Sequence, residues 1–381
     1  MKQSFTRILN YLGLTIAFTA FMVIMVQVQY ETSFCSNYKD AERTYRVERG
    51  YPIDDEHTDM YFCWFSRPML EKIKDAPEVQ RYVRFMGSSV ASATLRDIEN
   101  TTYSAARATG MMYANSATLE MMNVEMVCGS YDELASVPGV VISEPIAEKM
   151  FGKDSPLGKN ICISQWYSTD TLTIRGVFKP IKKNGLLSMD IAATYFDINQ
   201  HNNQSTIFCV TLHEGVTAEE ACASMQKLVD EYIESERDVD GSIKIRLTPI
   251  EDVHFLEDVG YDFVEKSSIG TLIALITVAL IIILVAMVNF WNIAFASVPS
   301  RIKSINTRKV LGASREELIG GQILEVVVMA LCAFVTSLLL LFVLRDTAIG
   351  DLVSEDINPL LHLDLVAYTA IGVIVLGALA G

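Results

Sequence analysis

The sequence predicts a membrane protein with four transmembrane helices and a large α+β extracytoplasmic domain between the first helix and the other three. The 381-residue chain is 50% hydrophobic, yet its formal net charge is −15. Its mean hydropathy of +0.28 is high for so acidic a chain, so the apolar residues must be gathered in separate segments. Long uncharged apolar runs do lie near residues 8–28, 267–300 and 326–344, and another begins at 365.

The charge is divided unevenly along the chain. Residues 30–266 hold 23 Lys or Arg and 38 Asp or Glu, whereas the rest of the chain holds eight of each sign. The net charge therefore belongs entirely to the middle segment, which is long enough for one sizeable globular domain. This acidity excludes a nucleic-acid-binding protein, which needs a basic face. The apolar runs exclude an ordinary soluble enzyme.

Residues 1–29 form the first predicted transmembrane helix, with a short cytoplasmic N-terminus. A helix needs roughly 20 predominantly apolar residues to cross a bilayer, and residues 11–28, extended by Ile8 and Leu9, satisfy this. A cleaved signal peptide is the alternative. Residues 27–31 lack the small-x-small pattern of a cleavage site, which favours an uncleaved anchor.

Residues 30–266 form the predicted external domain, and the pattern of apolar residues in it is mixed. Helices are expected at 68–74 and 217–234, strands at 140–143, 172–178, 207–212 and 243–247, and turns at 50–52 and 182–185. In the second helix Thr217 is the expected N-cap, and Ala221, Met225 and Val229 share one face. The segment is therefore a compact α+β domain.

Residues 267–381 form the predicted membrane domain, with helices at about 267–290, 319–344 and 364–381. The last of these is only 18 residues long and ends without a basic flank. Either this helix is short and tilted or the chain is truncated, and we favour truncation. Basic residues in short loops face the cytoplasm, and they are concentrated before the first helix and in the loop at 301–315. The predicted orientation places the N-terminus in the cytoplasm and residues 30–266 in the periplasm, in a bacterial inner membrane.

The chain has seven cysteines and five histidines, which could form disulfides or bind a metal ion. Six cysteines lie in the external segment and Cys332 lies in the third helix. Two interpretations stay open: disulfides formed in an oxidising periplasm, or buried free thiols that pack as small hydrophobes. The histidines are scattered without a ligand pattern such as H-E-x-x-H, so no metal site is expected. The histidines are His57, His201, His213, His254 and His362.

Residues 151–160 superficially resemble a phosphate-binding loop. The spacing is one residue too long, and Asn160 replaces the hydroxyl that would hold Mg²⁺. The loop also lies on the wrong side of the membrane for ATP. No catalytic triad is visible elsewhere, so we expect no enzymatic activity, no catalytic residue and no cofactor on this chain.

The loop at 301–315 carries the most functional information. It is predicted to contain a short basic amphipathic helix lying along the membrane, ended by a glycine. Either this helix is only a positive-inside anchor, or it is a lever on which a cytoplasmic partner pushes. The candidate coupling residues are Arg301, Lys303, Arg308, Lys309, Gly312 and Arg315.

Glu325 lies about two turns into the third predicted helix. An ionisable residue inside a membrane segment is a candidate functional residue. The alternative is that its carboxylate reaches the interface or pairs with an arginine of the loop.

The loop resembles the inner loop of the MacB/FtsX-like family of ABC permeases. That family has a helix ending in Asn-Phe, then Arg-x-Lys, then Arg-Lys-x-Leu-Gly-Ala-Ser/Thr. This chain has Asn289-Phe290, then Arg301 and Lys303, then residues 308–314. The family's usual Glu-Ile-Gly-Ile before the Arg-Lys pair is replaced here by residues 304–307, which lack the acidic residue. Glu325 matches a glutamate that is common early in the family's next helix.

The external segment is similar to the periplasmic core domain of the same family. Residues 40–47 resemble its first strand and residues 247–254 its last segment. Its most recognisable motif is matched by residues 140–144 together with Phe151, Gly152, Gly158 and Lys159. The matches run in the family's order from about residue 40 to residue 330.

The resemblance implies a non-catalytic permease subunit of a mechanotransmission-type ABC transporter. Such a subunit forms a homo- or heterodimer in the lipid membrane. A separate cytoplasmic ABC ATPase binds and hydrolyses ATP, and the helices relay its motion to the periplasmic domain. The exported or extruded substrate would be an antimicrobial, a peptide or a lipoprotein, with a periplasmic adaptor or substrate protein as a further partner. The alternatives are an extracytoplasmic sensor or signalling protein, and a regulator of cell-wall hydrolases.

Overall fold

The structure is a computed structural model, and it divides the chain into two compact units. One unit contains Met1–Thr32 and Ile269–Gly381, and the other contains Ser33–Ser268. The structure describes residues 2–51, 60–88, 94–97, 106–107, 111–114, 116–132, 139–164, 169–181, 184–186, 189–194, 206–235, 243–260, 262 and 264–380. His57, His201 and parts of both predicted turns (residue 52 and residues 182–183) lie outside the described residues.

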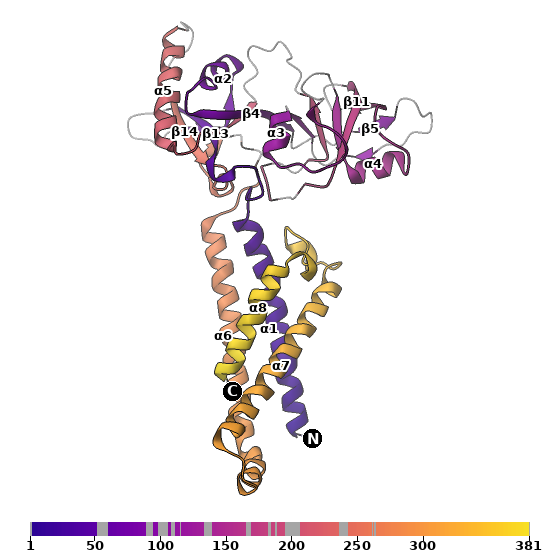
Figure 1. Ribbon diagram of the computed structural model, residues 1–381, viewed down its shortest axis with the longest axis vertical. Helices are drawn as coiled ribbons and strands as arrows, with labels where there is room; N and C mark the ends of the chain where they lie inside the picture. The colour runs from indigo at the N-terminus through magenta and orange to yellow at the C-terminus, as the bar shows by residue number, and fades with distance from the viewer. Residues whose placement is uncertain are drawn as a thin grey trace. The chain divides into compact units, whose positions relative to one another are not determined.

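The first unit contains four long helices (Figure 1). They are α1 (Lys2–Thr32), α6 (Ile269–Val310), α7 (Arg315–Leu344) and α8 (Leu363–Ala380), with short 3-10 turns at Gly350–Leu352 and Pro359–Leu361. Among the described residues, three helical segments are long and apolar enough to cross a membrane, namely Ile8–Thr32, Ile269–Asn289 and Arg315–Leu344. The apolar stretch of α8, Leu363–Ala378, is shorter. The fourth crossing stays a prediction.

Helix α1 organises the packing of this unit. Leu14, Phe18, Met22 and Val26 recur every four residues and are buried, as expected for one face of a helix. They form one cluster with residues of α7 and α8. The ring of Phe18 packs edge-on against Phe334, with centroids 5.9 Å apart. This stripe explains why α1, although exposed at several other positions, is held against the remaining helices.

Helix α6 differs from the prediction. It continues without interruption for 42 residues, from Ile269 to Val310, and is about 63 Å long at 1.5 Å per residue. The prediction of a separate short amphipathic helix within 301–315 is therefore wrong. The only proline in the segment, Pro299, lacks a backbone N–H, and the helix continues past it. The basic residues are the end of α6 itself.

A tight turn joins α6 to α7. Gly312 has φ of +95°, and its N–H donates to the Lys309 carbonyl while the Ala313 N–H donates to the Arg308 carbonyl. This is the Schellman arrangement that ends helices at a left-handed residue. Helix α7 then begins with a capping box, in which Ser314 and Glu317 exchange side-chain and backbone hydrogen bonds.

The second unit is built on a mixed sheet. The strand order is β15-β2-β1-β13-β4-β7-β12-β9-β11-β10-β5-β6, with β14 paired to β1, β3 to β13 and β8 to β11. The strands are β1 (Thr44–Tyr51), β2 (Met60–Phe62), β3 (Trp64–Phe65), β4 (Val79–Ser88), β5 (Thr94–Asp97), β6 (Ala106–Arg107), β7 (Met111–Ala114), β8 (Met126–Gly129), β9 (Val140–Ser143), β10 (Asn160–Ser164), β11 (Thr169–Phe178), β12 (Ile191–Thr194), β13 (Thr206–Leu212), β14 (Lys244–Pro249) and β15 (Val259–Gly260). The four predicted strands are β9, β11, β13 and β14, so this part of the prediction is confirmed.

Helices cover parts of this sheet. They are α2 (Arg67–Ile73), α3 (Ser116–Met121), α4 (Glu144–Phe151) and α5 (Ala218–Ser235), with 3-10 turns η1 (Ala41–Arg43) and η3 (Val253–Phe255). The predicted helices at 68–74 and 217–234 are α2 and α5. Thr217 and Glu220 cap α5 reciprocally, and Ala221, Met225 and Val229 enter a core with β1 and β13, as the periodicity predicts. The α+β fold class is confirmed.

Candidate functional site

The predicted coupling residues gather at the turn between α6 and α7. Arg308 and Lys309 lie in the last turn of α6, Gly312 follows in the connection, and Arg315 is the first residue of α7. Their side chains, where they have them, are exposed. Arg308 and Lys309 also interact favourably with the negative end of the α6 dipole. Arg301 and Lys303 lie further back on α6, and their side chains are outside the described part of the structure.

Two apolar residues share this turn with the basic ones. Val310 is 87% exposed and Leu311 is 82% exposed. Large apolar side chains this exposed at the end of a long helix are typical of a contact surface when they lie beside charged residues. Sequence reasoning concentrated on the basic residues and missed this pair, although both letters are visible between Lys309 and Gly312.

Glu325 lies on α7 with its side chain exposed on this protomer. Its neighbours Leu324 and Val328 are exposed too, at 63% and 49%. The carboxylate therefore points away from the cluster formed by α1, α7 and α8. Both interpretations of Glu325, a functional residue or one that reaches the interface, stay open.

The motif at 151–159 closes the loop between α4 and β10. Gly152 and Gly158 both have positive φ, at +60° and +78°, a conformation that favours glycine. The Gly158 N–H donates to the Ile174 carbonyl, and the Ile174 N–H donates to the Lys159 carbonyl. The Lys159 ammonium lies over the Phe151 ring, 4.7 Å from its centroid. These contacts give the motif a structural role. It ends α4 and positions the start of β10 beside β11.

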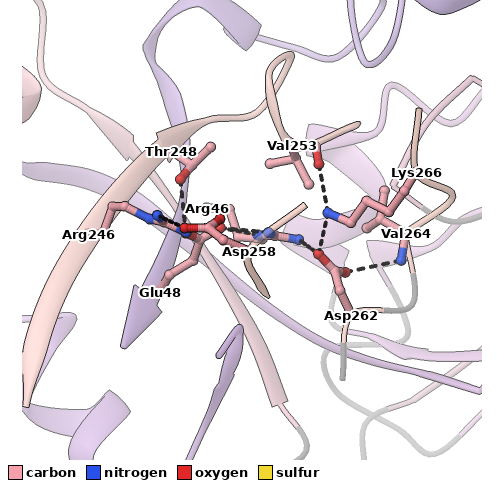
Figure 2. A network of polar contacts seen from close by, with 9 residues as sticks. All are labelled: Arg46, Glu48, Arg246, Thr248, Val253, Asp258, Asp262, Val264 and Lys266. Carbon is pink, nitrogen blue, oxygen red and sulfur yellow. Dashed lines mark hydrogen bonds and ion pairs between the residues drawn. The ribbon is translucent and has the colours of Figure 1, made fainter. Parts of the chain in front are cut away.

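The structure reveals a site that sequence reasoning missed, a buried network of charged side chains (Figure 2). Arg46 is at its centre. One guanidinium nitrogen lies 2.6 Å from Glu48 Oε1 and another lies 2.6 Å from Asp262 Oδ2. The exposed fractions of these three side chains are 0%, 0% and 3%. Arg46 thus forms two ion pairs, one with Glu48 and one with Asp262, and both are buried away from solvent.

Three further charged side chains, each partly exposed, and the hydroxyl of Thr248 complete the network. Arg246 binds Glu48 Oε2 at 2.7 Å and Asp258 at 2.7 Å. Lys266 lies 2.7 Å from Asp262, and the Thr248 hydroxyl donates to Glu48 at 3.0 Å. The members are three cations and three carboxylates, so the network is neutral as a whole. We call the six charged residues Arg46, Glu48, Arg246, Asp258, Asp262 and Lys266 the charge network.

Strand pairing builds one side of the charge network. Arg46 and Glu48 are two residues apart on β1 and therefore point to the same face. Strand β14 runs antiparallel beside β1, with Thr248 opposite Arg46 and Arg246 opposite Glu48. The other side comes from the segment that leads to α6, which carries Asp258, Asp262 and Lys266. The network thus joins the first long strand of the external unit, its last long strand and the residues just before α6.

The ionisation of the network follows from its geometry. Burial alone would raise the pKa of Asp262, but Arg46 and Lys266 together hold it below its usual value. Burial alone would lower the pKa of Arg46, but Glu48 and Asp262 raise it. Burial lowers the pKa of Lys266, and the bond to Asp262 offsets only part of that effect. Asp262 is therefore held as an anion against Arg46 and Lys266.

The network is arranged to hold elements together. Each carboxylate is engaged by a guanidinium or an ammonium group, so none is left as a general base. Among the residues that the structure describes, no group of three or more His, Cys, Asp or Glu could hold a metal ion. The sequence contained one signal: polar or charged residues alternate with apolar ones on both strands, as Arg46-Val47-Glu48 and as Arg246-Leu247-Thr248.

Three cysteines of the external unit lie in its core. No disulfide joins any of the seven cysteines, and Cys35, Cys63 and Cys209 are buried in one core. Burial raises the pKa of the Cys35 and Cys63 thiols to about 12 and raises that of Cys209 as well. For Cys35, Cys63 and Cys209 the structure agrees with the interpretation as buried thiols.

Comparison with known proteins identifies the family. The MacB-like periplasmic core domain family matches residues 8–228, more than half of the chain, and the FtsX-like permease C-terminal family matches residues 276–381. The uncharacterized ABC transporter permease YknZ of Bacillus subtilis (strain 168) is 29% identical over 200 residues. That match covers 50% of this chain and 45% of the relative, so the chain spans less than half of the relative's length.

Three solved structures are similar to part of this chain. A domain of a putative permease from Porphyromonas gingivalis is 22% identical, with a TM-score of 0.46, over 56% of this chain and 92% of that one. The periplasmic region of MacB from Actinobacillus actinomycetemcomitans is 14% identical, with a TM-score of 0.38, over 54% and 89%. The extracellular domain of the ABC-type transporter YknZ from Gram-positive bacteria is 16% identical, with a TM-score of 0.37, over 53% and 99%.

The resemblance predicted from the inner loop and the external motifs is thus confirmed by two family matches in the expected order. The apolar helices and the family together make this a membrane protein with an extracytoplasmic domain. The chain belongs to the MacB/FtsX-like family of ABC transporter permeases, with a MacB-like periplasmic core domain followed by an FtsX-like permease domain.

Proposed function

We propose that this chain is the non-catalytic permease subunit of a mechanotransmission-type ABC transporter. A separate cytoplasmic ATPase binds at the turn between α6 and α7, and its ATP-driven motion is relayed along the membrane helices to the external unit. The relay serves export or extrusion of an antimicrobial, a peptide or a lipoprotein. Two protomers, identical or related, work together, with the N-terminus and the turn in the cytoplasm and residues 33–268 outside the inner membrane.

The observation that carries this proposal is the composition of the turn. Val310 and Leu311 are almost fully exposed, and they lie beside Arg308 and Lys309. An apolar pair next to basic side chains fits a groove on a partner that is apolar at its base and acidic at its rim. The basic residues would steer the encounter, while the apolar pair would supply most of the affinity, because exposed ion pairs contribute little individually.

The continuity of α6 supports the relay. The helix runs unbroken from Ile269 to Val310, so the turn that a partner would contact and the residue that follows the external unit belong to one element. A displacement applied at Val310 is carried along a hydrogen-bonded helix rather than across a flexible loop. A separate helix lying along the membrane, as the sequence suggested, would transmit such a displacement less directly.

The test is co-purification of the full-length chain from its native membrane in mild detergent. The wild type is expected to retain an ABC ATPase, and the double variant Arg308→Glu/Lys309→Glu is expected to lose it. A second variant, Val310→Ser/Leu311→Ser, is expected to lose it as well. Lys227→Glu, an equally exposed reversal on α5, is the matched control and is expected to retain the ATPase. Unchanged recovery of the ATPase in both turn variants would contradict the proposal.

A further inference from the structure

We infer that two segments of the external unit are held together as one packed structure, which we call the joint. They are the segment after α1 (residues 33–38) and the segment before α6 (residues 264–268). The joint consists of Phe34, His254 and the charge network. It makes the segment after α1 and the segment before α6 move as one body with the β1–β14 strand pair. This inference rests on the proposed relay, because it names the residues through which the relay would enter the external unit.

The first part of the joint is a ring stack. Phe34 lies two residues beyond the end of α1, and His254 lies in the η3 turn that follows β14. Their rings are nearly parallel, with an interplanar angle of 13° and centroids 4.5 Å apart. Both side chains are buried. The segment that leaves α1 is therefore packed directly on the turn that follows the last long strand.

The second part ties the segment before α6 to the same turn. His254 Nδ1 lies 2.6 Å from the Glu265 carbonyl oxygen. Because that oxygen only accepts, Nδ1 carries the proton and donates it. The Ser267 N–H donates to the His254 carbonyl at 2.9 Å, and the Lys266 ammonium donates to the Val253 carbonyl at 2.8 Å. His254 thus contacts both segments at once, with its ring face on one and its ring nitrogen on the other.

The charge network anchors the joint to the sheet. Asp262 and Lys266 belong to the segment before α6, and Arg46 belongs to β1. The segment after α1 has its own anchor: the Cys35 N–H donates to the Asn184 carbonyl at 2.8 Å, and the Asn184 amide donates to the Ser33 carbonyl at 3.0 Å. Neither segment is a free linker, because each one is bonded to the core of the external unit.

This arrangement has a mechanical consequence. Close-packed interiors and hydrogen-bonded turns resist deformation, whereas unpacked linkers absorb displacement by rotating about φ and ψ. With the joint intact, a displacement of α1 or α6 is passed to the β1–β14 pair. With the joint loosened, the same displacement is lost in residues 33–38 and 264–268. Phe34 and His254 are positioning residues for the relay in this sense.

The first experiment measures the joint in the full-length chain, without a partner. Hydrogen exchange is recorded in lipid nanodiscs for the wild type, Phe34→Leu and His254→Phe. Phe34→Leu keeps an apolar side chain but removes the stack, and His254→Phe keeps a ring but removes the bond to Glu265. Both variants are expected to accelerate exchange in residues 33–38 and 264–268 by about tenfold, the effect of losing one hydrogen bond or ring contact on local opening.

Phe208→Leu is the matched control. Phe208 is equally buried, but it belongs to the core between α5 and the sheet and lies outside the joint. It is expected to leave exchange of both segments unchanged. If Phe34→Leu and His254→Phe both exchanged as slowly as the wild type at both segments, the inference would be overturned.

The second experiment measures transmission. The same proteins are studied with the co-purified ATPase, with and without ATP, and exchange is compared in the α6–α7 turn and in the external unit. The wild type and Phe208→Leu are expected to change at both places. The joint variants are expected to change at the turn and to lose the change in the external unit. Phe34→Tyr, which keeps the stack, is expected to restore it.

The two experiments separate two failures. A wild type with no ATP-dependent change in the external unit would contradict the proposed relay itself. A wild type that responds in the external unit, together with joint variants that respond equally, would contradict the joint and leave the relay standing. A joint variant that unfolded would show accelerated exchange throughout the external unit, which Phe34→Tyr and the control would distinguish from local loosening.

Discussion

Arg46 and Asp262 are separated by 216 residues in the sequence and joined by a 2.6 Å ion pair from which water is excluded. A pair of this kind costs much desolvation free energy, and replacing it with apolar residues of the same shape is often neutral or stabilising. Its presence at the junction between β1 and the segment before α6 is therefore better explained by positioning than by stability.

Removing Arg46 should destabilise the external unit strongly. Arg46→Met leaves the carboxylates of Glu48 and Asp262 buried with one cation fewer, and breaking such a network costs about 3–5 kcal/mol. The measurement is urea unfolding of the full-length chain in detergent, with tryptophan fluorescence as the signal. Lys227→Met is the control, because its pair with Glu231 is 4.0 Å long and exposed, and it should change the free energy of unfolding by less than about 0.5 kcal/mol. Equal effects of the two substitutions would contradict the prediction.

The free energy of unfolding should fall in acid because the carboxylate of Asp262 becomes protonated. Its pKa is lower in the folded chain than in the unfolded one, where it is about 3.9. The stabilising contribution is therefore fully present above about pH 4 and is lost as the pH falls through the folded-state pKa. Asp258 contributes in the same direction, because Arg246 donates to it and lowers its pKa. Thermal unfolding from pH 7 to pH 3 should show a steeper acid loss for the wild type than for Arg46→Met. Parallel curves would count against this assignment.

Two glycine-to-alanine substitutions should change the free energy of unfolding in opposite directions. Gly312 has φ of +95°, so Gly312→Ala should cost about 1–2 kcal/mol even though no atom lies within 4 Å of the added methyl group. Gly320 lies inside α7, also with open space around it, so Gly320→Ala should stabilise the helix by up to about 1 kcal/mol. Thermal unfolding of the full-length chain in detergent tests both. Stabilisation by Gly312→Ala would show that the turn does not need a left-handed residue.

The buried cysteines should be unreactive in the folded chain. Cys35 and Cys63 have thiol pKa values raised to about 12, so almost no thiolate is present at pH 7.5. Cys128 and Cys162, which are only half-buried, should react with a maleimide before Cys35 and Cys63. Mass spectrometry of peptides labelled before and after denaturation measures the difference. Rapid labelling of Cys35 or Cys63 in the native protein would contradict the buried position of both.

Several features were predictable because they depend on local composition. The apolar runs, the acidic external segment, the cap of α5 at Thr217 and the glycine stop at Gly312 all follow from patterns within a few residues. The prediction that the second transmembrane helix ends near residue 290 is wrong, because a change from apolar to polar residues does not by itself end a helix. Arg301, Lys303, Arg308 and Lys309 are polar but good helix formers, and the helix continues through this segment to Val310.

The sequence by itself determined the class of protein, the order of its parts and its family, since each of these is written in segments of the chain that can be compared one at a time. The tertiary structure decided which charged side chains meet and which ring covers His254. Arg46, Arg246 and Asp262 are ordinary surface residues by composition. They become a buried network only when β14 pairs with β1 and the chain returns beside them before α6. Strand register and burial are set by the whole fold, because the free energy of a buried charge depends on partners that are distant in the sequence.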